Sequence, residues 1–140
     1  MPIKEKKELL KKIKNKCKIK SEQYIKRYKR LKKIDQCLDL TISFLNSANI
    51  ALLISGLTFQ PVLIGCLVCS SSTLILSRLQ QSYNLKHKYN CHNNTVNNYN
   101  DIVREITNTL YRNHLTNEQL EDFIEYINSK ISLIEDTTII

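Results

Sequence analysis

Residues 40–77 read LTISFLNSANIALLISGLTFQPVLIGCLVCSSSTLILS and contain no Asp, Glu, Lys or Arg. The charged side chains stop at Asp39 and resume at Arg78, although 24% of the whole chain is charged. An uncharged run of this length predicts surroundings that exclude water, either a protein core or the hydrocarbon of a membrane. The rest of the chain is organised around this run.

Gly56 and Pro61 divide the run into two apolar arms. Gly often follows the last turn of a helix, whereas Pro suits the first turn because its missing N–H would have no partner there. The pattern predicts two antiparallel helices joined by a tight turn. About 18 residues at a rise of about 1.5 Å each give roughly 27 Å, close to the roughly 30 Å hydrocarbon thickness of a bilayer. Each arm is just long enough to cross a membrane.

Small residues recur every four positions in both arms, and such a strip lets two helix backbones approach closely in membranes. We therefore expect the arms to pack through Ser47, Ala51, Ser55, Gly65, Cys69, Thr73 and Ser77. Asn46, Asn49 and the serines at positions 70–72 oppose a membrane location, because a buried amide or hydroxyl without a partner costs roughly 1–3 kcal/mol. The alternative is a soluble hairpin covered by the flanking helices.

The composition predicts an all-α protein, because only two Gly and two Pro in 140 residues leave little material for tight turns between strands. We expect a basic amphipathic helix over residues 1–39 and the hydrophobic hairpin over residues 40–77. We then expect a polar helix over residues 78–114. The last element, residues 115–140, is expected to be an acidic helix that ends in a short tail from residue 137. The first residues are charged and lack an apolar run, so no cleaved export signal is expected.

The first helix is strongly basic, since residues 1–33 hold fifteen of the 21 basic side chains and three acidic ones. Its apolar residues form one stripe, which is interrupted at Lys20 and Ser21, so we expect a kink or a break there. A basic cluster lies directly before the first arm and consists of Lys26, Arg27, Lys29, Arg30, Lys32 and Lys33. Binding to anionic lipid headgroups, binding to nucleic-acid phosphates and a merely solvated helix face are the three interpretations. For an inserted hairpin, the positive-inside rule places both termini in the cytosol.

Two further helices are predicted after the hairpin. Six asparagines between residues 90 and 100 have poor helix propensity, so we expect fraying or a loop within an otherwise continuous helix over residues 79–114. Thr116 and Gln119 fit a capping box at the start of the last helix. An apolar stripe follows the box and consists of Leu120, Phe123, Ile124, Ile127, Ile131 and Ile134. Residues 115–140 hold six acidic side chains and one Lys. This helix is expected to pair with the basic first helix, within one molecule or between two.

Few residues have the character of a chemical site. Cys66 and Cys69 form a C-x-x-C pattern, but both lie in an apolar arm, which favours packing over a redox role. His87, Cys91 and His92 resemble metal ligands, yet no fourth ligand stands at zinc-like spacing. The five cysteines are expected as reduced thiols. We expect no catalytic residue, cofactor, bound metal or small-molecule substrate.

The order of these elements resembles that of uncharacterised proteins encoded by Polinton or Maverick-type elements and related double-stranded DNA viruses. The likeness rests on the Lys-rich first helix and the small-residue hairpin, followed by the segments LQQSYNLKHKYN (79–90) and LTNEQLEDFIEYI (115–127). It implies a viral or mobile-element product and a membrane or virion component, and it transfers no catalytic residue.

The patterns together favour a non-enzymatic, membrane-associated structural or interaction protein, with self-association as a further expectation. Two other classes remain. A membrane-permeabilising protein would line a wet path in an oligomer with Asn46, Asn49, Ser70 and Ser71. A soluble helical scaffold would bind nucleic acid through its basic first helix.

Overall fold

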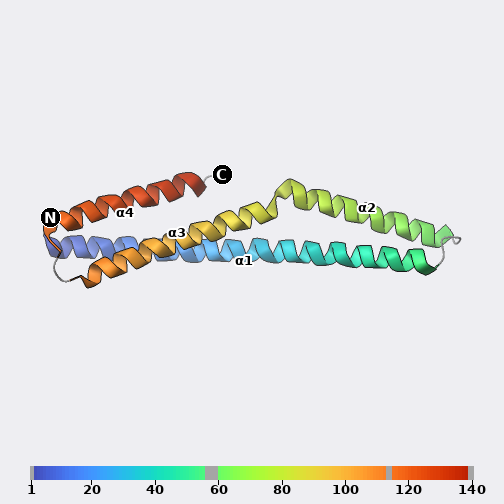
Figure 1. Cartoon of the computed structure of the whole chain (residues 1–140), viewed down its shortest axis with the longest axis horizontal. Coiled ribbons are helices and arrows are strands. Elements are labelled where there is room, and N and C mark those ends of the chain that lie inside the picture. Colours follow the sequence, from blue (N-terminus) through green and yellow to red (C-terminus); the bar gives the residue numbers. More distant parts are fainter. Residues whose placement is uncertain (1, 56–59, 113–114, 139–140) are drawn as a thin grey trace. The chain divides into compact units, whose positions relative to one another are not determined.

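The computed structural model describes residues 2–55, 60–112 and 115–138, which form four helices and no strand. These helices are α1 (Ile3–Ser55), α2 (Gln60–Tyr83), α3 (Leu85–Tyr111) and α4 (Asn117–Thr138) (Figure 1). The predicted all-α class is confirmed.

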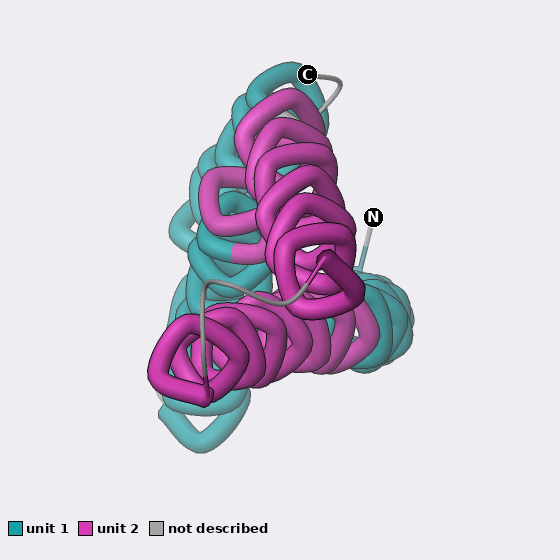
Figure 2. The backbone as a smooth tube through the Cα atoms, turned by 90° about the vertical axis from the view of Figure 1, so that its right-hand side faces the viewer, with its two compact units in different colours: residues 1–28, 90–140 teal, residues 29–89 magenta. Residues whose placement is uncertain are grey.

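The helices group into two compact units (Figure 2). The first, Met1–Tyr28 with Asn90–Ile140, is called the three-helix bundle, and the second, Lys29–Tyr89, is called the hairpin unit. Both α1 and α3 contribute residues to both units. The sequence-based boundaries at residues 39, 77 and 114 followed changes of composition, whereas the units group segments that touch, so their boundaries differ.

Helix α1 is continuous from Ile3 to Ser55, and the break expected at Lys20 and Ser21 is wrong. Ser21 occupies a stripe position and is buried, but its hydroxyl donates a hydrogen bond of 2.8 Å to Oδ1 of Asn100 in α3. A buried hydroxyl with a partner is tolerated. The polar residue that interrupts the apolar stripe is therefore accommodated by a hydrogen bond to another helix, and α1 stays continuous.

The three-helix bundle has its own hydrophobic core. Its buried members are Leu10, Cys17, Tyr99, Ile102, Ile106, Leu120, Ile127 and Ile134. Steps of three, four and seven put each helix's share on one face. Fully burying a large aliphatic side chain stabilises a fold by about 1.5–3 kcal/mol, so these contacts are the main source of the bundle's stability.

Ion pairs join the helices of the bundle and fix their directions. The pairs are Lys6 with Glu121, Lys20 with Glu135, and Lys130 with Glu105. The first two advance together along α1 and α4, so these helices are parallel, and the Ser21–Asn100 contact with the Tyr24–His92 ring contact makes α3 antiparallel to α1. The predicted pairing of the basic first helix with the acidic last helix is confirmed within one molecule.

The asparagine-rich segment is helical, so the expected fraying between residues 90 and 100 is wrong. Val96 and Tyr99 are buried there, and the Thr95 hydroxyl donates to the Cys91 carbonyl oxygen. Packing thus overrides the poor helix propensity of asparagine. The helix instead breaks at Asn84, which has a φ of 45°. Asn is among the residues that tolerate this left-handed conformation best.

The start of α4 follows its sequence signature. The Gln119 N–H donates to the Thr116 hydroxyl at 3.3 Å, and the Thr116 N–H donates to the Gln119 side-chain oxygen at 3.1 Å. The capping box is therefore confirmed, and the predicted stripe of α4 faces the core. Residues 137 and 138, expected in a tail, continue the helix.

Candidate functional site

The candidate site is the hairpin formed by α2 and the part of α1 that lies alongside it (Figure 1). Asn49 Nδ2 donates to Ser70 Oγ at 2.9 Å, and Leu52 packs over Gly65. Higher numbers on α1 meet lower numbers on α2, so the predicted antiparallel arrangement is confirmed. The predicted turn at Gly56 lies outside the described residues, and Pro61 occupies the first turn of α2 as expected.

The seam between the arms differs from the predicted pairing of two small-residue strips. The strip of α2 is half-buried, as Gly65, Cys69, Thr73 and Ser77 show, whereas the strip of α1, Ser47, Ala51 and Ser55, is exposed. The half-buried positions of α1 are instead Ile42, Leu45, Ala48, Asn49 and Leu52.

The reason for this difference is visible at Gly65. A Cβ built on this residue would lie 3.1 Å from Leu52 Cδ1. The close approach is therefore a leucine of α1 set over a glycine of α2, and small residues are needed on one arm only. A Leu side chain fills the space that a second small residue would leave empty.

Most polar groups of the arms have partners within the hairpin. Hydroxyls donate to backbone carbonyl oxygens three or four residues earlier in the same helix at Thr41, Ser47, Ser55, Ser71 and Thr73, with distances of 2.6–2.9 Å. Bonds of this kind satisfy a hydroxyl without water. The objection that these hydroxyls raise against an apolar environment is thereby much reduced, while Asn49 Oδ1 is buried without a partner among the described residues.

Many apolar side chains of the hairpin lie away from the seam and are exposed. No residue of α2 is buried, and Leu67, Leu74 and Ile75 are 68%, 66% and 61% exposed. Two helical segments, one in α1 and one beginning at Gln60, are long and apolar enough to cross a membrane, and 0% of the most apolar window of each is buried.

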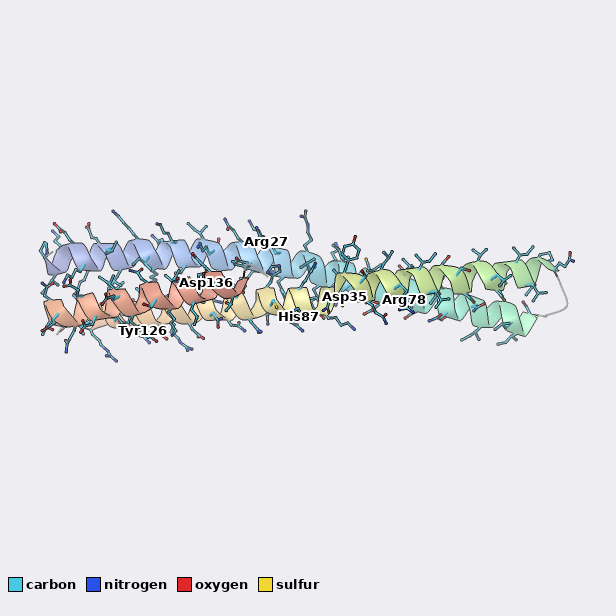
Figure 3. The ribbon with its side chains drawn as sticks, turned by 90° about the horizontal axis from the view of Figure 1, so that it is seen from above. Arg27, Asp35, Arg78, His87, Tyr126 and Asp136 are labelled. Atoms are coloured by element: carbon cyan, nitrogen blue, oxygen red, sulfur yellow. The ribbon has the colours of Figure 1, made fainter. Side chains whose placement is uncertain are left out.

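A polar contact closes the end of the hairpin that lies away from the turn. Gln80 Nε2 donates to Oδ1 of Asp35 and to Oδ1 of Asp39, both at 2.8 Å. Figure 3 labels Asp35 on α1 and Arg78 on α2 at this same end. The charges that border residues 40–77 in the sequence therefore also border the apolar arms in space.

The basic cluster lies on α1 just before the arms. All of its members, Lys26, Arg27, Lys29, Arg30, Lys32 and Lys33, are exposed. The Arg27 guanidinium lies 5.5 Å from the centroid of the Tyr24 ring, and Lys32 also has an interaction partner. The structure thus leaves this charge accessible to an anionic surface.

His92 belongs to an aromatic cluster of the bundle. Its ring lies 5.6 Å from that of Tyr24, and its Nδ1 is buried without a hydrogen-bond partner in the part of the chain that the structure describes. Burial and the charge of Arg27 hold the pKa of His92 below its usual range, and burial raises the pKa of the Cys17 thiol. Across residues 2–55, 60–112 and 115–138, no group of three His, Cys, Asp or Glu side chains is placed to hold a metal ion.

No disulfide joins any of the five cysteines, all of which lie in the described part of the chain. Cys66 and Cys69 are both half-buried in α2, Cys17 is buried in the bundle, and Cys37 and Cys91 are exposed. The C-x-x-C pair shares the inner side of α2 with Gly65, which suits the packing interpretation.

The sequence interpretation missed two buried charged residues, Lys6 and Asp35, each 3% exposed. The Lys6 ammonium donates to the Asn117 carbonyl oxygen at 3.0 Å and pairs with Glu121, whose pKa it lowers. Both residues stand four positions from stripe residues, Lys6 before Leu10 and Asp35 after Leu31. Extending the stripe irrespective of polarity would have found them.

Comparison of the chain with protein-family models, curated proteins and solved structures finds no match.

Proposed function

We propose that this protein is a non-enzymatic, membrane-associated structural or interaction protein whose hairpin, residues 40–77, crosses a bilayer twice. One observation carries the proposal: both apolar windows are 0% buried, whereas the bundle buries a core of its own. Soluble proteins seldom expose a contiguous apolar surface of this extent. Lipid supplies the missing apolar surroundings for both arms.

The polar groups of the arms support this location. In hydrocarbon, a hydroxyl must find its partner within the protein, and those of Thr41, Ser47 and Ser71 do so on their own helices. The same contacts disfavour the membrane-permeabilising alternative. Asn49 and Ser70 bond to each other, and the Ser71 hydroxyl donates to the Leu67 carbonyl oxygen, so three of the four side chains of that alternative are not free to line a wet path. Asn46 is the fourth, and its carboxamide has no hydrogen bond among the described residues.

The basic cluster supports an orientation and a lipid partner. It lies next to the first arm, where each basic residue near an anionic surface contributes about 1 kcal/mol to membrane binding. The positive-inside rule then places both termini in the cytosol. With the resemblance to proteins of Polinton-type elements and related viruses, the membrane concerned is that of a host cell or virion.

Alkaline carbonate extraction of expressing cells tests the insertion of the hairpin. We expect the protein to stay in the membrane pellet, and we expect Leu67→Lys to weaken this retention, because a Lys at the centre of a spanning helix costs about 2.5–3.5 kcal/mol. The matched control is Leu133→Lys on α4, where the leucine is 65% exposed against 68% for Leu67. Release of the unmodified protein as a monodisperse soluble species would overturn the proposal.

Vesicles separate the remaining alternatives. Flotation with vesicles of anionic lipid, compared with zwitterionic vesicles, should show stronger association with the former, and replacing Lys29, Arg30 and Lys33 by Gln should remove the difference. Dye release at nanomolar protein would instead favour a permeabilising protein. Salt-sensitive retention on DNA without flotation would favour the nucleic-acid scaffold.

A further inference from the structure

The two arms present different outer surfaces. On α2 the outward side chains are almost all aliphatic, including Leu63, Ile64, Leu67, Leu74 and Ile75. The hydroxyl of Ser71, which interrupts them, is bonded to its own helix. This surface needs nothing but lipid.

The outer surface of α1 carries a second stripe beside the seam. It consists of Ser43, Asn46, Ile50 and Leu53, all exposed and spaced by steps of three and four. Such a spacing places these residues on one helix face. We call this set the outer stripe of α1.

Asn46 is the residue of the outer stripe that lipid cannot accommodate. No hydrogen bond joins its carboxamide to any residue in the described part of the chain. It stands seven residues beyond Asp39, which at about 1.5 Å per residue is roughly 10 Å into the apolar arm. At that depth lipid tails offer neither donor nor acceptor, so the carboxamide requires a protein partner.

We propose that the outer stripe of α1 is a self-association surface whose occupant is the same stripe of a second copy. This proposal rests on the proposed membrane insertion. A carboxamide both donates and accepts, so two Asn46 side chains related by a two-fold axis satisfy each other. The pair of hairpins then places α1 against α1 and leaves α2 toward lipid.

The neighbours of Asn46 suit this contact. Ser43 lies within the stripe and Ser47 beside it, and small side chains allow two helix backbones to come close enough for amide hydrogen bonds. The Ser47 hydroxyl is bonded to the Ser43 carbonyl oxygen, so it brings no further unpaired donor into the interface. Ile50 and Leu53, 58% and 43% exposed, add apolar contacts on the same face.

Disulfide trapping in proteoliposomes tests the surface. In a background with Cys37, Cys66, Cys69 and Cys91 replaced by Ser or Ala, and buried Cys17 kept, Ser43→Cys on the outer stripe, which leaves Asn46 in place, should form a cross-linked dimer with copper phenanthroline. Leu67→Cys on the outer face of α2 is the control and should stay monomeric. Equal cross-linking of the two variants would overturn the proposal.

A second measurement avoids cysteine. Energy transfer between labelled copies in vesicles should show dimerisation about threefold to tenfold weaker for Asn46→Leu, little changed for Asn46→Gln, and unchanged for Ser71→Leu. Undiminished dimerisation of Asn46→Leu would contradict the role of the carboxamide. Carbonate extraction of each variant is done in parallel. Loss of retention counts against the proposed membrane function, whereas a retained monomer counts against the self-association surface alone.

Discussion

The three-helix bundle and the hairpin unit share α1, yet the bundle buries its large apolar side chains and the hairpin unit exposes many of its own. In the bundle, Ile102 and Ile106 of α3 and Ile127 of α4 are 0% exposed and belong to one hydrophobic core. In the hairpin, Ile64 and Ile75 are 62% and 61% exposed, although they belong to a far more apolar part of the sequence. The less hydrophobic region has the core.

This difference shows that burial follows periodicity and partner number more than hydrophobic content. Each bundle helix concentrates its apolar residues on one stripe, and three stripes enclose a core. The arms of the hairpin are apolar on nearly every side, and two helices alone cannot enclose all those surfaces. A helix that is apolar all round requires further apolar surroundings.

The largest expected effect separates the two regions by the same deletion made in each. Ile106→Ala should lower the free energy of unfolding of the detergent-solubilised protein by about 2–5 kcal/mol, because it leaves a cavity in the bundle core. Ile75→Ala should change it by less than about 0.5 kcal/mol, because this side chain faces outward. Denaturant titration followed by circular dichroism measures both.

Should Ile106→Ala fail to fold, Ile106→Val tests the same point with an expected loss of about 0.5–1.5 kcal/mol. Equal losses of unfolding free energy for Ile106→Ala and Ile75→Ala would contradict the difference between bundle and hairpin, since they would mean that the hairpin buries Ile75 in a core of its own.

A smaller effect is expected at the cap of α4. Thr116→Ala removes the hydroxyl that accepts from the Gln119 N–H, and it should cost about 1 kcal/mol of unfolding free energy. Ser132→Ala, on the exposed side of the same helix, should stay within about 0.5 kcal/mol. A loss at position 132 as large as that at 116 would show that the cap contributes nothing specific. Thermal unfolding of the two variants side by side decides this.

The smallest expected effect is a pH dependence confined to the bundle. The pKa of His92 is lowered, so between its folded value and the ordinary value of about 6.5 the unfolded chain binds more protons than the folded one. Stability should therefore be complete above about pH 6.5 and decrease as the pH falls below it. Melting at pH 7.5 and pH 5.5 should differ, and His92→Gln should reduce the difference. A variant with the same pH dependence as the unmodified protein would exclude His92 as its source.

Much of this architecture was predictable from local patterns. The charge-free run with Gly56 and Pro61 predicted the hairpin, and the capping box with the stripe that follows it predicted α4. Each of these signals depends on residues close together in the sequence, where helix geometry alone relates spacing to face.

The errors concern contacts between distant residues. Ser21 is accommodated by Asn100, and the asparagine-rich part of α3 is held helical by the burial of Val96 and Tyr99. The face of α1 that meets α2 was also predicted wrongly, because Leu52 fits over Gly65. Spacing within one helix cannot reveal such a fit, because it depends on the shape of the partner.

The hydroxyl bonds within the arms have a kinetic consequence. The hydroxyls of Ser47, Ser71 and Thr73 each donate to a carbonyl oxygen of their own helix. These hydrogen bonds are kept when the helix moves from water to hydrocarbon. Transfer of the hairpin from water to hydrocarbon then breaks few hydrogen bonds to water at these positions. For the insertion proposed above, the desolvation barrier is correspondingly low, because the arms are already helical before they meet the bilayer.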